Sequence, residues 1–189
     1  IMGIEQYCLF RIGDAGFPLQ QLQFSSPGEN KFPNADTGKL LQPSEWYHVA
    51  VVYDTEKKTA VIYVDGREQS RIEDYGNGEP VNLGKQTRGK DFMFKIGHSY
   101  GDPDYMERQL DGEICEVRVW NVARSQQEIF DNMYNIEDPA NTPGLQAYWK
   151  FNEGEGDIAK DYTGHGNDAK AYVKATWPAG IEVTQKNKE

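Results

Sequence analysis

The sequence has few cysteines, histidines and basic residues, and each shortage excludes a class of function. It contains two cysteines and three histidines. These are too scattered to supply the three or four convergent ligands of a zinc site. Acidic residues outnumber basic ones by 30 to 20, a net charge of −10, which disfavours nonspecific attraction to nucleic acid or to an anionic membrane surface. A cation or a neutral glycan is the better partner.

Long apolar runs are also absent. No stretch approaches the ~20 apolar residues that span a bilayer, and no basic segment leads into an apolar one as in an export signal. The hydrophobic content of 38% is enough for one sizeable core. We therefore predict a single domain over residues 1–189, with residues 174–189 as a C-terminal extension and no membrane span.

The carboxylates do not form the pair that a retaining glycoside hydrolase needs. That pair lies ~5 Å apart on one strand face, and residues four apart share a face whereas residues three apart do not. Glu113 and Glu116 are three apart, with Cys115 between them. Glu153 and Glu155 lie in a glycine-containing turn that does not hold a pair in place. We predict that the protein is not an enzyme, and hydrolysis is the weakest alternative.

Strand-like runs recur between turn signals, as in an all-β sandwich. The polar loop from Asp54 to Lys58 and the Asp65-Gly66 dipeptide predict a three-stranded meander. The expected strands lie at Gln6 to Ile12, Leu19 to Phe24, Tyr47 to Asp54, Ala60 to Val64, Phe92 to Gly97, Glu113 to Trp120, Gln146 to Phe151 and Asp168 to Val173. Because Cys8 and Cys115 both fall on these strands, we expect two buried free thiols, with a disulfide as the alternative.

One short helix is expected at about residues 125–134. Ser125 has Glu128 three residues later, which is the spacing of a capping box. Ile129 and Met133 follow as an i, i+4 apolar pair.

Five motifs, in order along the chain, closely resemble the laminin-G-like and pentraxin-like branch of the concanavalin A-like jelly rolls. They are Trp46 to Asp54, Val61 to Glu68, Phe92 to His98, Leu110 to Trp120 and Leu145 to Gly156. The resemblance covers roughly Tyr7 to Ala171. It implies a jelly-roll β-sandwich of two antiparallel sheets, and the one fold hosts lectins, enzymes and interaction modules.

The resemblance also implies a setting for the chain. It suggests a piece of an exported bacterial surface protein, located outside the cell, at its surface or in the periplasm. In the family, two or more strands precede the segment that resembles residues 1–14. We therefore expect an upstream domain or a neighbouring chain to complete the sandwich by strand addition.

A metal site is expected in the segment DYTGHGND, residues 161–168. The segment is similar to the D-x-S/T-G-x-G-N loop of laminin-G-like domains, where calcium often binds, and its oxygens and tight turns suit that ion. The expected ligands are Asp161, Thr163, Gly164 and Asn167, with Asp168 as a further oxygen source. The alternative is an Asx-rich turn whose side chains satisfy their own backbone.

The leading hypothesis is a non-catalytic recognition module that binds a glycan or a protein through its loops. The loop at residues 99–109 carries rings and carboxylates that suit such a ligand, and the expected ligand-binding residues are Tyr100, Asp102, Asp104 and Tyr105. The alternative is a structural or protein-interaction domain that packs on an upstream domain.

Overall fold

The computed structural model describes residues 1–5, 7–13, 18, 20–26, 41–85, 93–98, 109–171 and 176–178. The chain divides into two compact units. Unit 1 comprises Ile1–Asp111 and Arg124–Phe130, and unit 2 comprises Gly112–Ala123 and Asp131–Glu189. Each unit is described by itself, and the expected single domain stays a prediction.

Unit 1 contains a four-stranded antiparallel sheet in the order β3-β2-β1-β7. The strands are β1 (Met2–Ile4), β2 (Cys8–Ile12), β3 (Leu22–Ser25) and β7 (Lys95–Ile96). Phe10 pairs with Phe24 and Ile12 with Leu22. Because side chains alternate along a strand, this register places four apolar residues on one face of the sheet.

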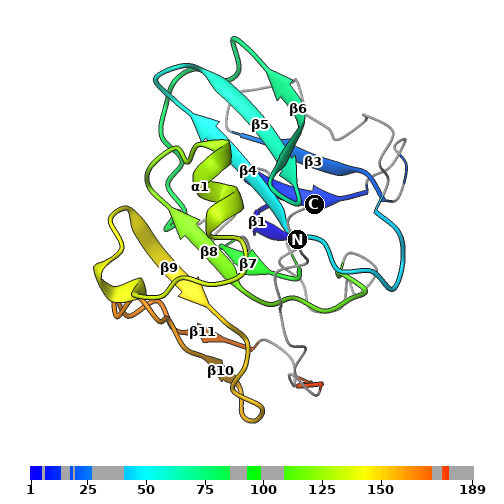
Figure 1. The fold of residues 1–189 in the computed structure, drawn as a ribbon, viewed down its shortest axis with the longest axis vertical. Coiled ribbons are helices and arrows are strands. Elements are labelled where there is room, and N and C mark those ends of the chain that lie inside the picture. Colours follow the sequence, from blue (N-terminus) through cyan, green and yellow to red (C-terminus); the bar gives the residue numbers. More distant parts are fainter. Residues whose placement is uncertain are drawn as a thin grey trace. The chain divides into compact units, whose positions relative to one another are not determined.

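The predicted meander is confirmed as the second sheet of unit 1 (Figure 1), with β4 (Val49–Asp54), β5 (Thr59–Val64) and β6 (Arg67–Ile72) in that order. Oδ1 of Asp54 accepts hydrogen bonds from the backbone N–H groups of Glu56 and Lys57, at 3.1 and 3.0 Å, which fixes the first hairpin loop. Asp65 and Gly66 both have positive φ, 49° and 69°, as the second tight turn requires.

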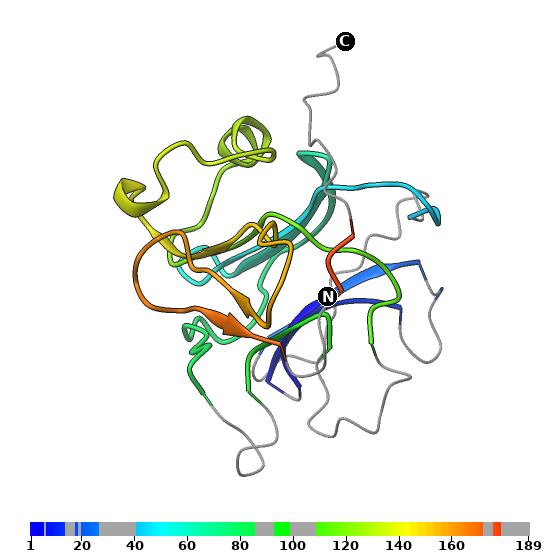
Figure 2. The same cartoon turned by 90° about the horizontal axis from the view of Figure 1, so that it is seen from below.

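The core of unit 1 lies between these two sheets, which can be followed as blue and cyan strands in Figure 2. Phe10, Leu22 and Phe24 from the first sheet pack with the inner residues of β5 and with Tyr75, whose side chain is fully buried. Each such apolar side chain stabilises the fold by ~1.5–3 kcal/mol.

Helix α1 (Gln126–Asp131) confirms the expected helix, although it ends three residues earlier than predicted. Its capping box is formed in full. The backbone N–H of Glu128 donates to Oγ of Ser125 at 3.3 Å, and Oε2 of Glu128 accepts from the backbone N–H of Ser125 at 2.8 Å. Ile129 is buried against Val61 and Tyr63 on the outer face of β5. Local sequence starts this helix and packing on the meander retains it.

Unit 2 consists of two antiparallel strand pairs and a 3-10 helix. The pairs are β8 (Val117–Trp120) with β9 (Leu145–Trp149), and β10 (Ile158–Ala159) with β11 (Ala169–Lys170), and the 3-10 helix is η2 (Pro139–Asn141). Ile136, Leu145 and Tyr148 form its core with Trp120 packed against them. Within the described part of the chain, no helix has the length and apolar character to cross a membrane.

Several strand boundaries differ from the sequence prediction. β8 begins at Val117 rather than Glu113, because Glu116 has a φ of 58°, which interrupts extended backbone. β1 and β10 were not predicted, and each is only two or three residues long. Both cysteines are free thiols, as expected. Cys8 is buried, but the prediction that Cys115 is buried as well was wrong, because it precedes β8 and is only half-buried. The all-β sandwich with a short helix is confirmed.

Candidate functional site

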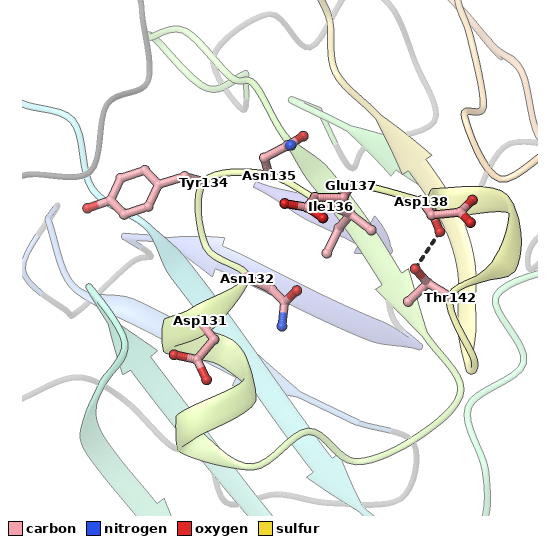
Figure 3. A pocket seen from close by; sticks show the side chains of 8 residues that line it. All are labelled: Asp131, Asn132, Tyr134, Asn135, Ile136, Glu137, Asp138 and Thr142. Carbon is pink, nitrogen blue, oxygen red and sulfur yellow. Dashed lines mark hydrogen bonds between the residues drawn. The ribbon is translucent and has the colours of Figure 1, made fainter.

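A hollow of about 450 Å³ opens on unit 2 (Figure 3). We call it the 131–142 hollow, and it is lined by Asp131, Asn132, Tyr134, Asn135, Ile136, Glu137, Asp138 and Thr142. Ile136 is buried and belongs to the core of the unit, so it fixes the floor. The other lining side chains are polar or aromatic.

The segment that lines the hollow is held by its own short-range hydrogen bonds. Oγ1 of Thr142 donates to the backbone oxygen of Asp138 at 2.6 Å, the bond drawn in Figure 3. Nδ2 of Asn141 donates to the Asp138 carboxylate, at 2.9 Å to the nearer oxygen. Pro139 starts η2, where its fixed φ suits the first helical position. These bonds hold the rim of the hollow at Asp138.

The lining suits a ligand rich in hydroxyl groups. Three carboxylates, from Asp131, Glu137 and Asp138, can accept hydrogen bonds, while side-chain amides can both donate and accept. The ring of Tyr134 adds a flat apolar surface of the kind that packs on a sugar. Among the described residues, no lysine or arginine lines the hollow, so its lining favours neutral over anionic ligands.

A buried polar cluster anchors the backbone next to the hollow. The hydroxyl of Tyr148 donates to Oε2 of Glu116, and Nη2 of Arg118 donates to the same oxygen at 2.5 Å. Nη1 of Arg118 donates to the backbone oxygen of Met133 at 3.2 Å. Burial, and then the hydrogen bond to Glu116, raises the pKa of Tyr148 to about 12. The cluster thus ties the segment before Asn135 to the β8-β9 pair.

The same cluster explains why Glu116 does not act as a free carboxylate in a hydrolytic pair. One of its oxygens is engaged by a buried arginine and a buried tyrosine. Glu153 is engaged as well, because its Oε1 accepts a hydrogen bond from the backbone N–H of Lys160 at 2.8 Å. Two of the four carboxylates that the sequence raised as hydrolytic candidates, one from each pair, therefore make structural bonds.

The expected metal loop is organised around the carboxylate of Asp161, which is 8% exposed. Oδ1 accepts from the backbone N–H groups of Tyr148 and Thr163, at 3.1 and 3.0 Å, and from the Thr163 hydroxyl at 2.7 Å. Oδ2 accepts from the backbone N–H of Asn167 at 3.1 Å. Burial acts to raise the pKa of Asp161, but these hydrogen bonds outweigh it and the pKa is lowered. The carboxylate is satisfied by the chain itself.

The other expected ligands also make hydrogen bonds within the chain. The Thr163 hydroxyl accepts from the backbone N–H of His165 at 3.3 Å while it donates to Asp161. The backbone oxygen of Asn167 accepts from Nε1 of Trp149 at 2.8 Å. The N–H of Gly164 donates to the backbone oxygen of Asp161 at 3.3 Å. The donors that converge on Asp161 disfavour a calcium ion beside its carboxylate, and the calcium site stays a prediction.

The four residues expected to bind a ligand, Tyr100, Asp102, Asp104 and Tyr105, lie outside the described residues, so their role stays a prediction. Sequence reasoning missed the 131–142 hollow. The available signal was the run DNMYNIEDPANT, which is rich in Asp and Asn directly after the helix. Within the described ranges, no group of three or more His, Cys, Asp or Glu side chains could hold a metal ion.

The antiparallel sheets and the one short helix of the described residues are those of a β-sandwich protein. The chain belongs to the concanavalin A-like lectin/glucanases superfamily, whose family model matches residues 3–130. This confirms the family that the motifs indicated.

Comparison with solved structures gives a related protein from Bacteroides ovatus, described as a putative carbohydrate binding protein, with 31% identity and a TM-score of 0.73. The match covers 97% of this chain and 50% of that one, so this chain spans half the length of its relative. An S-layer domain-containing protein from Clostridium thermocellum matches at 22% identity over 68% of this chain and 62% of its own. Its TM-score is 0.36. Comparison with curated proteins gave no match.

Proposed function

We propose that this chain is a non-catalytic recognition module that binds carbohydrate. The observation that carries the proposal is the likeness to the Bacteroides ovatus protein, which extends over 97% of the chain at 31% identity. That protein is described as a putative carbohydrate binding protein, and the superfamily includes lectins. Because one fold hosts several functions, the residues of the site decide which ligand is bound.

The 131–142 hollow is the proposed sugar site. Its rim carries carboxylates and amides that can bind ring hydroxyls, and Tyr134 offers a face for packing. A ligand of one or two sugar rings suits a hollow of about 450 Å³. Its acidic lining and the net charge of −10 favour neutral glycans over uronic or sulfated ones.

Absence of catalysis is part of the proposal. Hydrolysis of a glycosidic bond needs one carboxyl group to protonate the leaving oxygen and a second to attack or to activate water. Glu116 is bound to Arg118 and Tyr148, and Glu153 to the backbone of Lys160. Residues held in this way orient the fold and do not serve as a catalytic pair.

We also propose that the module works outside the cytoplasm, as part of an exported surface protein. The resemblance of its motifs to laminin-G-like surface domains supports this setting, as does a ligand class that is abundant on cell surfaces. The partner is then a glycan of a cell wall, a capsule or a host surface, and an upstream domain or a neighbouring chain lies beside the module.

A glycan array tests the function, and matched variants test the site. Wild-type protein should bind neutral oligosaccharides, and Tyr134→Ala and Glu137→Gln should each weaken that binding at least tenfold. The matched controls, Tyr162→Ala and Glu155→Gln, alter exposed residues of the same types outside the hollow and should bind normally.

The outcomes separate the possible sites. Binding that survives in the hollow variants but is lost in Tyr100→Ala or Tyr105→Ala would move the site to the 99–109 loop. A wild-type protein that binds no glycan would contradict the proposed function and favour a module that packs on another protein.

A further inference from the structure

We propose that the loop at residues 161–168, which we call the Asp161 loop, is closed by the Asp161 carboxylate itself and takes no calcium ion. In this arrangement the carboxylate is the centre to which the surrounding groups converge, the position that a cation holds in a metal loop. The inference concerns the stability of unit 2 and does not depend on the proposed function.

The carboxylate of Asp161 is the acceptor in every hydrogen bond that it makes with the loop and with β9. Three backbone N–H groups and one hydroxyl donate to its two oxygens, at 2.7 to 3.1 Å. Each carboxylate oxygen has two lone-pair positions; three of the donors converge on Oδ1, which leaves it no position for a cation, and the fourth donates to Oδ2. A calcium ion requires several oxygens with free lone pairs 2.3–2.6 Å from it, and Oδ1 offers none.

The groups around the Asp161 carboxylate carry partial or full positive charge. N–H and O–H groups present their positive ends to Asp161, which is favourable for an anion and unfavourable for a cation. The neighbouring carboxylate of Asp168 accepts from the backbone N–H of Asp161 at 2.9 Å, and its other oxygen is 2.5 Å from the ammonium of Lys160. A cation entering the loop would have to displace Lys160 or break several bonds to Asp161.

The closed loop is connected to strand β9. The Tyr148 N–H belongs to β9, while Thr163 and Asn167 belong to the loop itself. Nδ2 of Asn167 donates back to the oxygen of Gln146 at 3.0 Å, and Trp149 donates to the Asn167 oxygen at 2.8 Å. Asp161 therefore fastens the segment between β10 and β11 to β9 without an ion.

Calcium titration of the full chain by calorimetry tests the inference directly, together with thermal melts in millimolar calcium and in chelator. The melting temperature should be the same in both solutions, and calorimetry should detect no saturable binding at this loop. Asp161→Asn places an N–H donor where an acceptor is needed, so its melting temperature should fall by several degrees, equally with calcium and with chelator. Asp157→Asn alters an exposed carboxylate nearby and should leave the melting temperature unchanged.

A second variant covers the case in which Asp161→Asn does not fold. Thr163→Val removes one of the four donors and leaves the carboxylate in place. It should lower the melting temperature by a smaller amount, again equally in both solutions, whereas Thr163→Ser should restore it. The inference is overturned if calcium raises the wild-type melting temperature by several degrees and the rise disappears in Asp161→Asn or shrinks in Thr163→Val. Saturable calcium binding that follows the same pattern would also overturn it.

Discussion

The hydroxyl of Tyr148 donates a hydrogen bond to Oε2 of Glu116, although 32 residues separate them in the chain. Tyr148 is fully buried. The backbone of Glu116 has a φ of 58°, a conformation that residues other than glycine rarely adopt. Because Arg118 binds the same carboxylate oxygen, an anion, a cation and a phenol form one largely buried group beside the hollow.

Tyr148→Phe should destabilise the protein without altering its fold. The substitution keeps the ring and removes one hydrogen bond to a charged group, which costs about 1.5–3 kcal/mol. Equilibrium unfolding in urea measures the loss. Tyr162→Phe is the matched control, because the hydroxyl of Tyr162 bonds to Asn152 at an exposed position and its removal should cost less than about 0.5 kcal/mol. Equal losses in the two variants would show that the cluster at Glu116 has no special weight.

Ser125→Ala should weaken helix α1. The variant loses the hydroxyl that accepts from the backbone N–H of Glu128, which costs about 0.5–2 kcal/mol. Urea unfolding measures the change, and Ser125→Asp should recover most of it because aspartate also caps well. If Ser125→Ala leaves the free energy of unfolding unchanged, the packing of Ile129 alone maintains the helix.

The capping box should also make stability depend on pH. Hydrogen bonds from the backbone and side chain of Ser125 lower the pKa of Glu128 below its ordinary value. A depressed folded-state pKa stabilises the fold above the unfolded pKa, about 4.3, and this stabilisation is lost as pH falls through the folded value. Glu128→Gln should therefore narrow the stability difference between pH 6 and pH 3 measured by urea unfolding. If the substitution leaves the pH dependence of stability unchanged, the capping box is not a source of that dependence.

Gly66→Ala should destabilise unit 1 more than Gly154→Ala destabilises unit 2. Both glycines have positive φ, 69° and 79°, and the backbone strain alone costs about 1–2 kcal/mol at each. A Cβ at residue 66 would also lie 2.7 Å from Cδ2 of Phe130, whereas the space around residue 154 is open. Overpacking adds about 1–3 kcal/mol. Thermal melts of the two variants compare the losses of stability. Equal losses would contradict the close contact between residue 66 and Phe130.

The two thiols should differ in their reactivity. Burial raises the pKa of Cys8 to about 12 and also raises the pKa of Cys115, which is only half-buried. Because the thiolate is the reactive form, a thiol reagent at pH 8 should label Cys115 slowly and Cys8 only on unfolding. Mass spectrometry of labelled peptides reports the order. Faster labelling of Cys8 would contradict the packing of β2.

The sequence predicted those elements whose determinants are local. Ser125 and Glu128 lie three residues apart and close a capping box by themselves. Asp65 and Gly66 similarly specify a tight turn, so the meander was expected. The start of β8 was not predictable in this way, because apolar alternation from Glu113 onward contains no sign that Glu116 adopts a positive φ.

The site was harder to predict than the fold. The sequence predicts Asp161 as one of several metal ligands in the 161–168 loop, but it does not show whether the oxygens of Asp161 face a cation or N–H groups. The structure shows donors from β9 and from the loop, and Tyr148 is 13 residues away in the chain. The 131–142 hollow depends on the packing of Ile136, and no spacing rule reveals such an arrangement.

Affinity electrophoresis through gels that contain a neutral polysaccharide tests the central claim most directly, with the eluted polysaccharide then examined for cleavage. The account predicts that the wild-type protein is retarded, that Tyr134→Ala migrates as in an empty gel, and that the polysaccharide remains intact. Unretarded wild-type protein on every neutral polysaccharide tried, or shortened chains after contact with it, would contradict a non-catalytic carbohydrate-binding module.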